Sequence, residues 1–120
     1  MSAYNWIDFE SRCPVCRAAG RIEAQTHVAA SYDGDDTGRF HDRHYALGEP
    51  MAWFPAADPR YPQWRMAGEP SGSDGTVEAC YASCAASHHR LCAVVEFVSL
   101  VALRVVDVTP ESAWPQGFAR

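Results

Sequence analysis

Five cysteines constrain this 120-residue chain more than any other feature, and four of them fall into two pairs. Cys13 and Cys16 are separated by two residues, and Cys80 and Cys84 are separated by three. Two thiolates at such spacings can point at one tetrahedral ion when the backbone turns tightly between them. The sequence therefore predicts a structural Zn²⁺ ion held by Cys13, Cys16, Cys80 and Cys84.

Three other readings of the cysteines stay open at this stage, one of which is that they are ordinary reduced or buried thiols. Cys80, Cys84 and His88 are each four residues apart, so on a helix they would share one face. His88 is therefore a rival ligand to Cys80 in a site with three cysteines and one histidine. Alternatively, Cys13 and Cys16 form a redox pair, although such pairs normally begin a helix in a βαβ unit, which this sequence does not predict. Cys92 precedes an apolar stretch and is expected to be a buried thiol.

The two cysteine pairs resemble the broad zinc-ribbon and treble-clef class of modules. In that class, a CxxC knuckle near the N-terminus shares a metal ion with a second cysteine pair from elsewhere in the chain. Here the resemblance covers Cys13 to Cys16 and Cys80 to Cys84, and the second pair has one residue more than is usual in the class. The resemblance implies a metal ion that serves the fold.

The remaining pattern predicts one α+β domain over residues 1–120, predominantly antiparallel β. Residues 21–32 alternate between apolar and polar side chains, which indicates a half-buried strand. Residues 43–54 predict two short strands broken by glycine and proline. Residues 91–108 are apolar on both faces and predict one or two central strands with a break near Ser99.

Two further segments are defined by composition. Residues 76–92 are ambiguous, because their alanines favour a helix whereas a metal knuckle requires a turn. Residues 68–75, rich in glycine and serine, predict a flexible loop.

Composition excludes several classes of function. The net charge is −5 and no basic stripe occurs, so nucleic acid is a poor candidate for a partner. The chain has no lysine, which excludes a Walker-type phosphate loop and Schiff-base chemistry. No apolar run is long enough to cross a membrane, and the first residues do not form a secretion signal. We therefore expect a cytoplasmic protein with reduced cysteines.

Four aromatic residues lie in a proline-rich stretch, namely Trp53, Phe54, Tyr61 and Trp64. Aromatic side chains of this kind are enriched at the centres of protein interfaces. They equally complete the core of a small β domain. The first interpretation makes them a partner-binding surface, and the second makes them structural.

The sequence thus favours a zinc-binding domain that acts through protein–protein interaction, in the manner of an adaptor or an immunity protein. One alternative is a nucleic-acid-associated zinc ribbon, which requires Arg12, Arg17, Arg21 and Arg43 to converge on one face. The other is a zinc-dependent enzyme, which requires three protein ligands and an open position for water. The sequence assigns no catalytic residue and so leans away from an enzyme.

Overall fold

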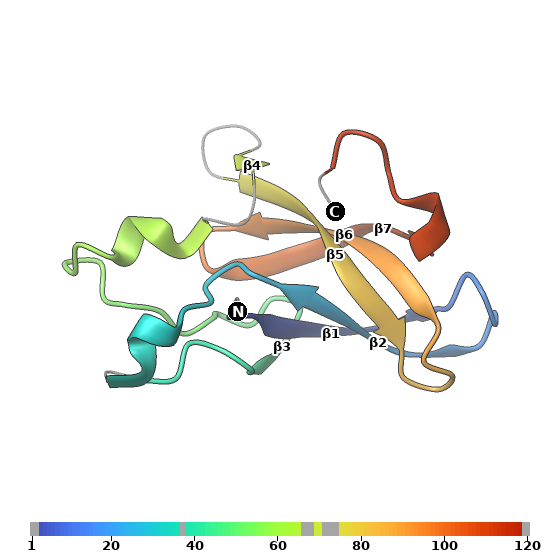
Figure 1. Ribbon diagram of the computed structural model, residues 1–120, viewed down its shortest axis with the longest axis horizontal. Coiled ribbons are helices and arrows are strands. Elements are labelled where there is room, and N and C mark those ends of the chain that lie inside the picture. The colour runs from blue at the N-terminus through green and yellow to red at the C-terminus, as the bar shows by residue number, and fades with distance from the viewer. Residues whose placement is uncertain (1–2, 37, 66–68, 71–74, 119–120) are drawn as a thin grey trace.

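The computed structural model describes residues 3–36, 38–65, 69–70 and 75–118 (Figure 1). Its regular elements are seven strands and three short 3₁₀ helices. In chain order they are β1 (Asn5–Arg12), β2 (Ala19–Thr26), η1 (Tyr32–Asp36), β3 (His44–Ala46), η2 (Tyr61–Arg65), β4 (Glu69–Pro70), β5 (Gly75–Cys84), β6 (Arg90–Val98), β7 (Val101–Pro110) and η3 (Glu111–Ala113).

All seven strands belong to one curled sheet. Its order is β3-β1-β2-β5-β6-β7, and β4 pairs with β5 beside this path. Every pair is antiparallel except β1 with β3, which is parallel and makes the sheet mixed. The sheet twists strongly along its length, so that it forms half of a barrel (Figure 1).

The predicted α+β class is wrong, because the described residues contain strands and 3₁₀ turns but no α-helix. The ambiguous stretch 76–92 is a β-hairpin, formed by β5 and the start of β6. Its alanines occupy strand positions because β5 is paired on both sides, with β2 and with β6. Tertiary pairing therefore overrides the helix propensity of these residues.

The other strand predictions are partly confirmed. The strand expected at 21–32 ends at Thr26, where the Thr26 hydroxyl accepts a hydrogen bond from the Val28 amide, 3.0 Å away, and the chain turns. The 43–54 stretch contains one strand, β3, and residues 51–54 are irregular. The break near Ser99 is confirmed, since Ser99 has a φ of 53° in the turn between β6 and β7.

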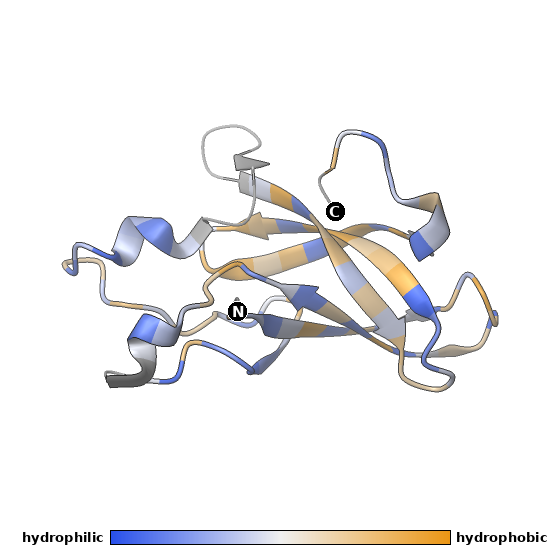
Figure 2. Ribbon diagram, viewed as in Figure 1, coloured by the Kyte–Doolittle hydropathy of each residue, from blue (hydrophilic) through white to orange (hydrophobic). Residues whose placement is uncertain are grey.

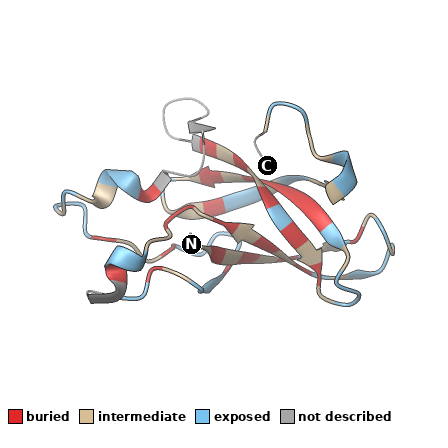
Figure 3. Cartoon of the chain, in the orientation of Figure 1, coloured by how far each residue is buried: buried red, intermediate tan, exposed pale blue. Residues whose placement is uncertain are grey.

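The core lies on the concave side of the half-barrel. Alternate residues of β1, β2 and β5 are buried, which gives the banding of these strands in Figure 3. Apolar residues run along β6, whereas β5 is mixed in hydropathy (Figure 2). Fully buried large side chains of this core include Ile7, Ile22, Leu91, Val95 and Phe97.

Two sequence expectations concern the rest of the chain. The loop expected at 68–75 lies mostly outside the described residues, of which Glu69–Pro70 form β4 and Gly75 begins β5. In the part of the chain that is described, no helix is long and apolar enough to span a membrane.

Candidate metal centre

Two hairpin turns meet at one end of the sheet. The first joins β1 to β2 and carries Cys13 and Cys16, and the second joins β5 to β6 and begins at Cys84. Both turns lie at the right-hand end of the molecule in Figure 1. They are adjacent because β2 pairs with β5, with Ile22 opposite Cys84.

The sulfur atoms of Cys13, Cys16 and Cys84 lie within 4.8 Å of one another. The Sγ atoms of Cys16 and Cys84 are 3.9 Å apart. In a tetrahedral zinc site with Zn–S bonds of about 2.3 Å, neighbouring sulfurs are about 3.8 Å apart. The three cysteines therefore have the spacing of ligands around one ion, and this group can hold a metal.

Backbone amides at the turns point at these sulfurs. The Val15 amide lies 3.4 Å from Cys13 Sγ. A hydrogen bond from the Ala18 backbone, together with those from the Cys13, Cys84 and Ser87 side chains, lowers the pKa of Cys16 despite desolvation. Amide donors of this kind stabilise the thiolate, which is the form that binds a metal.

Backbone amides also act on Cys84, but the other groups around its sulfur disfavour the thiolate. The Ser87 amide has the largest influence and lowers the pKa of Cys84, as the Ala86 amide also does. Desolvation and the thiols of Cys16 and Cys13 outweigh them, so the pKa lies above its ordinary value. Three thiolates packed together repel one another, and a bound cation removes this repulsion.

The three cysteines lie where the core meets the surface. Cys13 and Cys84 are buried, with exposed fractions of 1% and 4%, while Cys16 is half-buried. Ser87, in the second turn, is exposed. The centre is therefore shielded on the side of the core and accessible from the side of the second turn.

The structure does not bring Cys80 to this group. Cys80 and Cys84 lie on the same strand and the same face, and four strand residues span about 13 Å, which is too far for a shared ion. Cys80 is buried, and its Sγ lies 3.1 Å from Glu78 Oε1. Burial and the neighbouring Glu78 charge raise the pKa of Cys80 well above its ordinary value, so the site favours the thiol form, which is not a ligand.

The remaining candidates from the sequence also lie apart from the three sulfurs. His88 is exposed in the second turn and does not belong to the group of close ligand atoms found among the described residues. Cys92 is buried in β6, as expected. Cys16 is followed by a hairpin strand rather than by a helix, which removes the support that a helix N-terminus gives to a redox pair.

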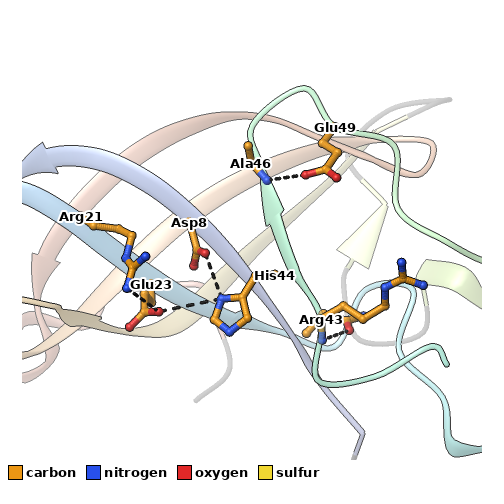
Figure 4. A network of polar contacts seen from close by, with 8 residues as sticks. Asp8, Arg21, Glu23, Arg43, His44, Ala46 and Glu49 are labelled. Atoms are coloured by element: carbon orange, nitrogen blue, oxygen red, sulfur yellow. Dashed lines mark hydrogen bonds and ion pairs between the residues drawn. The ribbon is translucent and has the colours of Figure 1, made fainter.

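A second group of ligand-type side chains lies on the outer face of β1, β2 and β3 (Figure 4). His44 Nδ1 is 2.9 Å from Asp8 Oδ2 and 3.8 Å from Glu23 Oε2. Arg21 approaches the same Glu23 oxygen at 3.6 Å. Asp8 and Glu23 thus already have polar partners at the surface, in His44 and Arg21, and we assign no metal to this network.

The four aromatic residues proposed for partner binding contribute to packing. Phe54 and Trp64 are buried, and Trp53 and Tyr61 are half-buried. Trp53 Nε1 donates a hydrogen bond to the Tyr61 carbonyl at 3.0 Å, and the Trp53 ring packs against Phe40. These contacts favour the structural interpretation, while a role in partner binding stays a prediction.

A groove of about 470 Å³ opens between β1 and β7. It is lined by residues 9–12, by Leu47 and by residues 103–108. Leu103 and Val106 are 50% and 48% exposed, because two β-bulges leave them without a partner residue in β6. Bulges commonly re-aim side chains in this way, and here they place two apolar side chains at the groove.

Comparison of the chain with protein-family models, with curated proteins and with solved structures gave no match.

Proposed function

We propose that this protein is a small β domain stapled by one structural Zn²⁺ ion on Cys13, Cys16 and Cys84. The observation that carries the proposal is the convergence of three sulfurs, within 4.8 Å of one another, from two turns far apart in the sequence. Thiolate ligands in a tetrahedral arrangement favour zinc among the common divalent ions.

The ion would stabilise the domain by adding a link between the turns of two hairpins that pair through β2 and β5. No preformed site exists in the unfolded chain, so the free energy of metal binding adds to that of folding. This contribution matters here because the core contains several alanines and threonines, which bury little apolar area.

The test is the metal content of protein purified under reducing conditions, measured by elemental analysis. We expect about one zinc per chain in the wild type, and its loss in Cys13→Ser and Cys84→Ser. Cys80→Ala is the matched control, because it removes a buried cysteine from the same strand and face as Cys84. This control should retain its zinc.

Two results contradict the proposal. The first is wild-type protein that binds no zinc even after reconstitution with the metal under reducing conditions. The second is loss of zinc from folded Cys80→Ala together with its retention in Cys84→Ser, which would move the site to the interior of β5.

A second function, protein binding, is supported by the groove between β1 and β7. Its apolar centre is formed by Leu47, Leu103 and Val106, which are 38%, 50% and 48% exposed. Charged residues of both signs surround this centre, namely Glu10, Arg12, Arg104 and Asp107. An apolar centre with a mixed polar rim is the usual anatomy of a protein interface.

The interface can be tested with peptides selected on the folded protein from a random display library. We expect the double variant Leu103→Lys with Val106→Lys to weaken binding of the selected peptides at least about tenfold, because two charges enter the apolar centre. Ser112→Lys adds a charge at an exposed position outside the groove and should leave binding unchanged. Equal binding to the double variant and the wild type would reject the groove as the interface.

The positions of the arginines support a protein over a nucleic acid as the partner. The Arg43 amide lies 3.1 Å from the Asn5 side chain at the start of β1, whereas Arg12 ends the same strand. Seven residue steps of a strand separate these positions by roughly 23 Å. Arg21 faces Glu23 at 3.6 Å, so these charges do not form one phosphate-binding patch.

A further inference from the structure

The two turns at the metal centre have the same length. In the first hairpin, Arg12 pairs with Ala19, and in the second, Ser83 pairs with Arg90. Each turn therefore encloses six residues, 13–18 in one case and 84–89 in the other. Cys13 and Cys84 occupy the same first position of their turns.

The first turn is closed by two backbone hydrogen bonds. The Cys13 amide donates to the Ala18 carbonyl at 3.0 Å, and the Arg17 amide donates to the Cys13 carbonyl at 2.8 Å. Arg17, the fifth residue of the turn, has a φ of 64°. The Val15 amide, at the third position, points at Cys13 Sγ.

The second turn repeats each of these features. The Cys84 amide donates to the His89 carbonyl at 3.2 Å, and the His88 amide donates to the Cys84 carbonyl at 2.6 Å. His88, again the fifth residue, has a φ of 55°. The backbone of Ala86, at the third position, acts to lower the pKa of Cys84.

The equivalence of the turns pairs Ser87 with Cys16, the fourth residue of each. Cys16 contributes a sulfur to the group of three. The Ser87 hydroxyl is one of the groups that lower the pKa of Cys16, which agrees with a place beside this sulfur. The second turn is thus built as a metal knuckle in which an oxygen replaces the second sulfur.

We propose that Ser87 Oγ occupies the fourth ligand position of the metal centre, completing a site of three sulfurs and one oxygen. This inference rests on the proposed zinc site and adds its fourth ligand. A hydroxyl is a harder and weaker ligand for zinc than a thiolate, so this vertex is the exchangeable one. Because Ser87 is exposed, water has access to the same vertex.

The fourth ligand can be tested with Co²⁺ as a spectroscopic substitute for zinc. The intensity of the sulfur-to-cobalt charge-transfer band grows with the number of Co–S bonds. We expect Ser87→Cys to raise this intensity by about one-third over the wild type, since four sulfurs replace three, and to bind zinc at least about tenfold more tightly. Ser87→Ala should retain the three-sulfur band and bind zinc more weakly.

Ala86→Cys is the matched control, because it adds a cysteine in the same turn at the position equivalent to Val15, which is 44% exposed. It should leave the band and the affinity unchanged. The inference is overturned if wild type binds cobalt but Ser87→Cys has the wild-type band, or if Ala86→Cys raises the band equally.

Failure of the zinc proposal itself gives a different result. If neither the wild type nor Ser87→Cys binds cobalt, the three cysteines are not a metal site. If only Ser87→Cys binds, Ser87 does lie at the fourth position, but the natural chain has no metal centre.

Discussion

At the scale of single residues, position decides the chemistry of cysteine. Cys80 and Cys84 lie on the same face of β5, four residues apart. Burial, and then the neighbouring Glu78 carboxylate, raise the pKa of Cys80 well above its ordinary value, whereas turn amides act to lower the pKa of Cys84, which is also raised but less strongly. One is therefore suited to remain a thiol in the core and the other to bind a cation.

Glu78 itself makes stability depend on pH. Its side chain is buried and accepts hydrogen bonds from Thr26, at 2.6 Å, and from Cys80. Desolvation outweighs these hydrogen bonds and raises the pKa of Glu78 above 4.5. A raised pKa means that its contribution to stability is fully present below the unfolded pKa and is lost as pH rises through the folded pKa.

We therefore expect the free energy of unfolding of the wild type to fall, relative to Glu78→Gln, as pH rises from about 4.5 toward neutrality. The amide cannot ionise, so the variant lacks this pH dependence. Urea denaturation of both proteins across this pH range measures the difference. If the difference in the free energy of unfolding does not change with pH, burial does not favour the protonated form of Glu78.

At the scale of elements, β5 shows why one strand was hard to predict. Its buried positions alternate with half-buried and exposed ones, as a strand requires. The buried residues are small or polar, namely Thr76, Glu78, Cys80, Ala82 and Cys84. The alternation in burial is therefore matched by hydropathy only from Cys80 onward, because the buried Thr76 and Glu78 are polar, and a sequence pattern records hydropathy alone. By contrast, the apolar run of 91–108 predicted β6 and β7 with their break.

The backbone conformation of the first turn has an energetic cost that can be measured. Arg17 has a φ of 64°, a conformation that is unfavourable for residues other than glycine. We expect Arg17→Gly to raise the free energy of unfolding by up to about 1 kcal/mol, measured by urea denaturation of the zinc-loaded protein. Arg17→Ala keeps the strain and should give no gain. A glycine variant no more stable than the alanine variant would show that this turn is not strained.

At the scale of the whole molecule, the three cysteines that could hold a metal lie at one end of the half-barrel. Two hairpins, β1–β2 and β5–β6, meet there, and β2–β5 pairing is short in register, from Ile22 opposite Cys84 to Ala24 opposite Ala82. A bound ion would add a further link between the two halves of the sheet at this end, beside the β2–β5 pairing and the hydrogen bond from the Ala85 amide to the Arg21 carbonyl. Removal of the ion should loosen this end first.

We expect chelation of the metal to lower the free energy of unfolding, by roughly 4 kcal/mol if free zinc exceeds its dissociation constant a thousandfold. Hydrogen exchange should show faster exchange of amides in turns 13–18 and 84–89, with less change in the middle of β6. Zinc added back should restore protection. Equal loss of protection throughout the sheet, or no loss of protection at all, would contradict a metal ion that stabilises mainly this end of the sheet.

The sequence could predict part of this account. Cys13 and Cys16 were identifiable because their geometry depends only on a local turn. The choice between Cys80 and Cys84 depends on whether residues 76–84 are helix or strand, and the helical spacing that linked Cys80 to Cys84 and His88 does not hold in β5. Ser87 follows Cys84 at the spacing that separates Cys13 from Cys16, but serine is not a usual zinc ligand, so this spacing gains meaning only from the equivalence of the two folded turns.

The most direct measurement is X-ray absorption spectroscopy at the zinc edge of the wild-type protein. The account predicts three sulfur ligands at about 2.3 Å and one lighter ligand, oxygen, at about 2.0–2.2 Å. A shell of four sulfurs would contradict it, because a further cysteine, from Cys80 or Cys92, would then have to reach the ion. A shell of two or fewer sulfurs would contradict the convergence of Cys13, Cys16 and Cys84 on one metal.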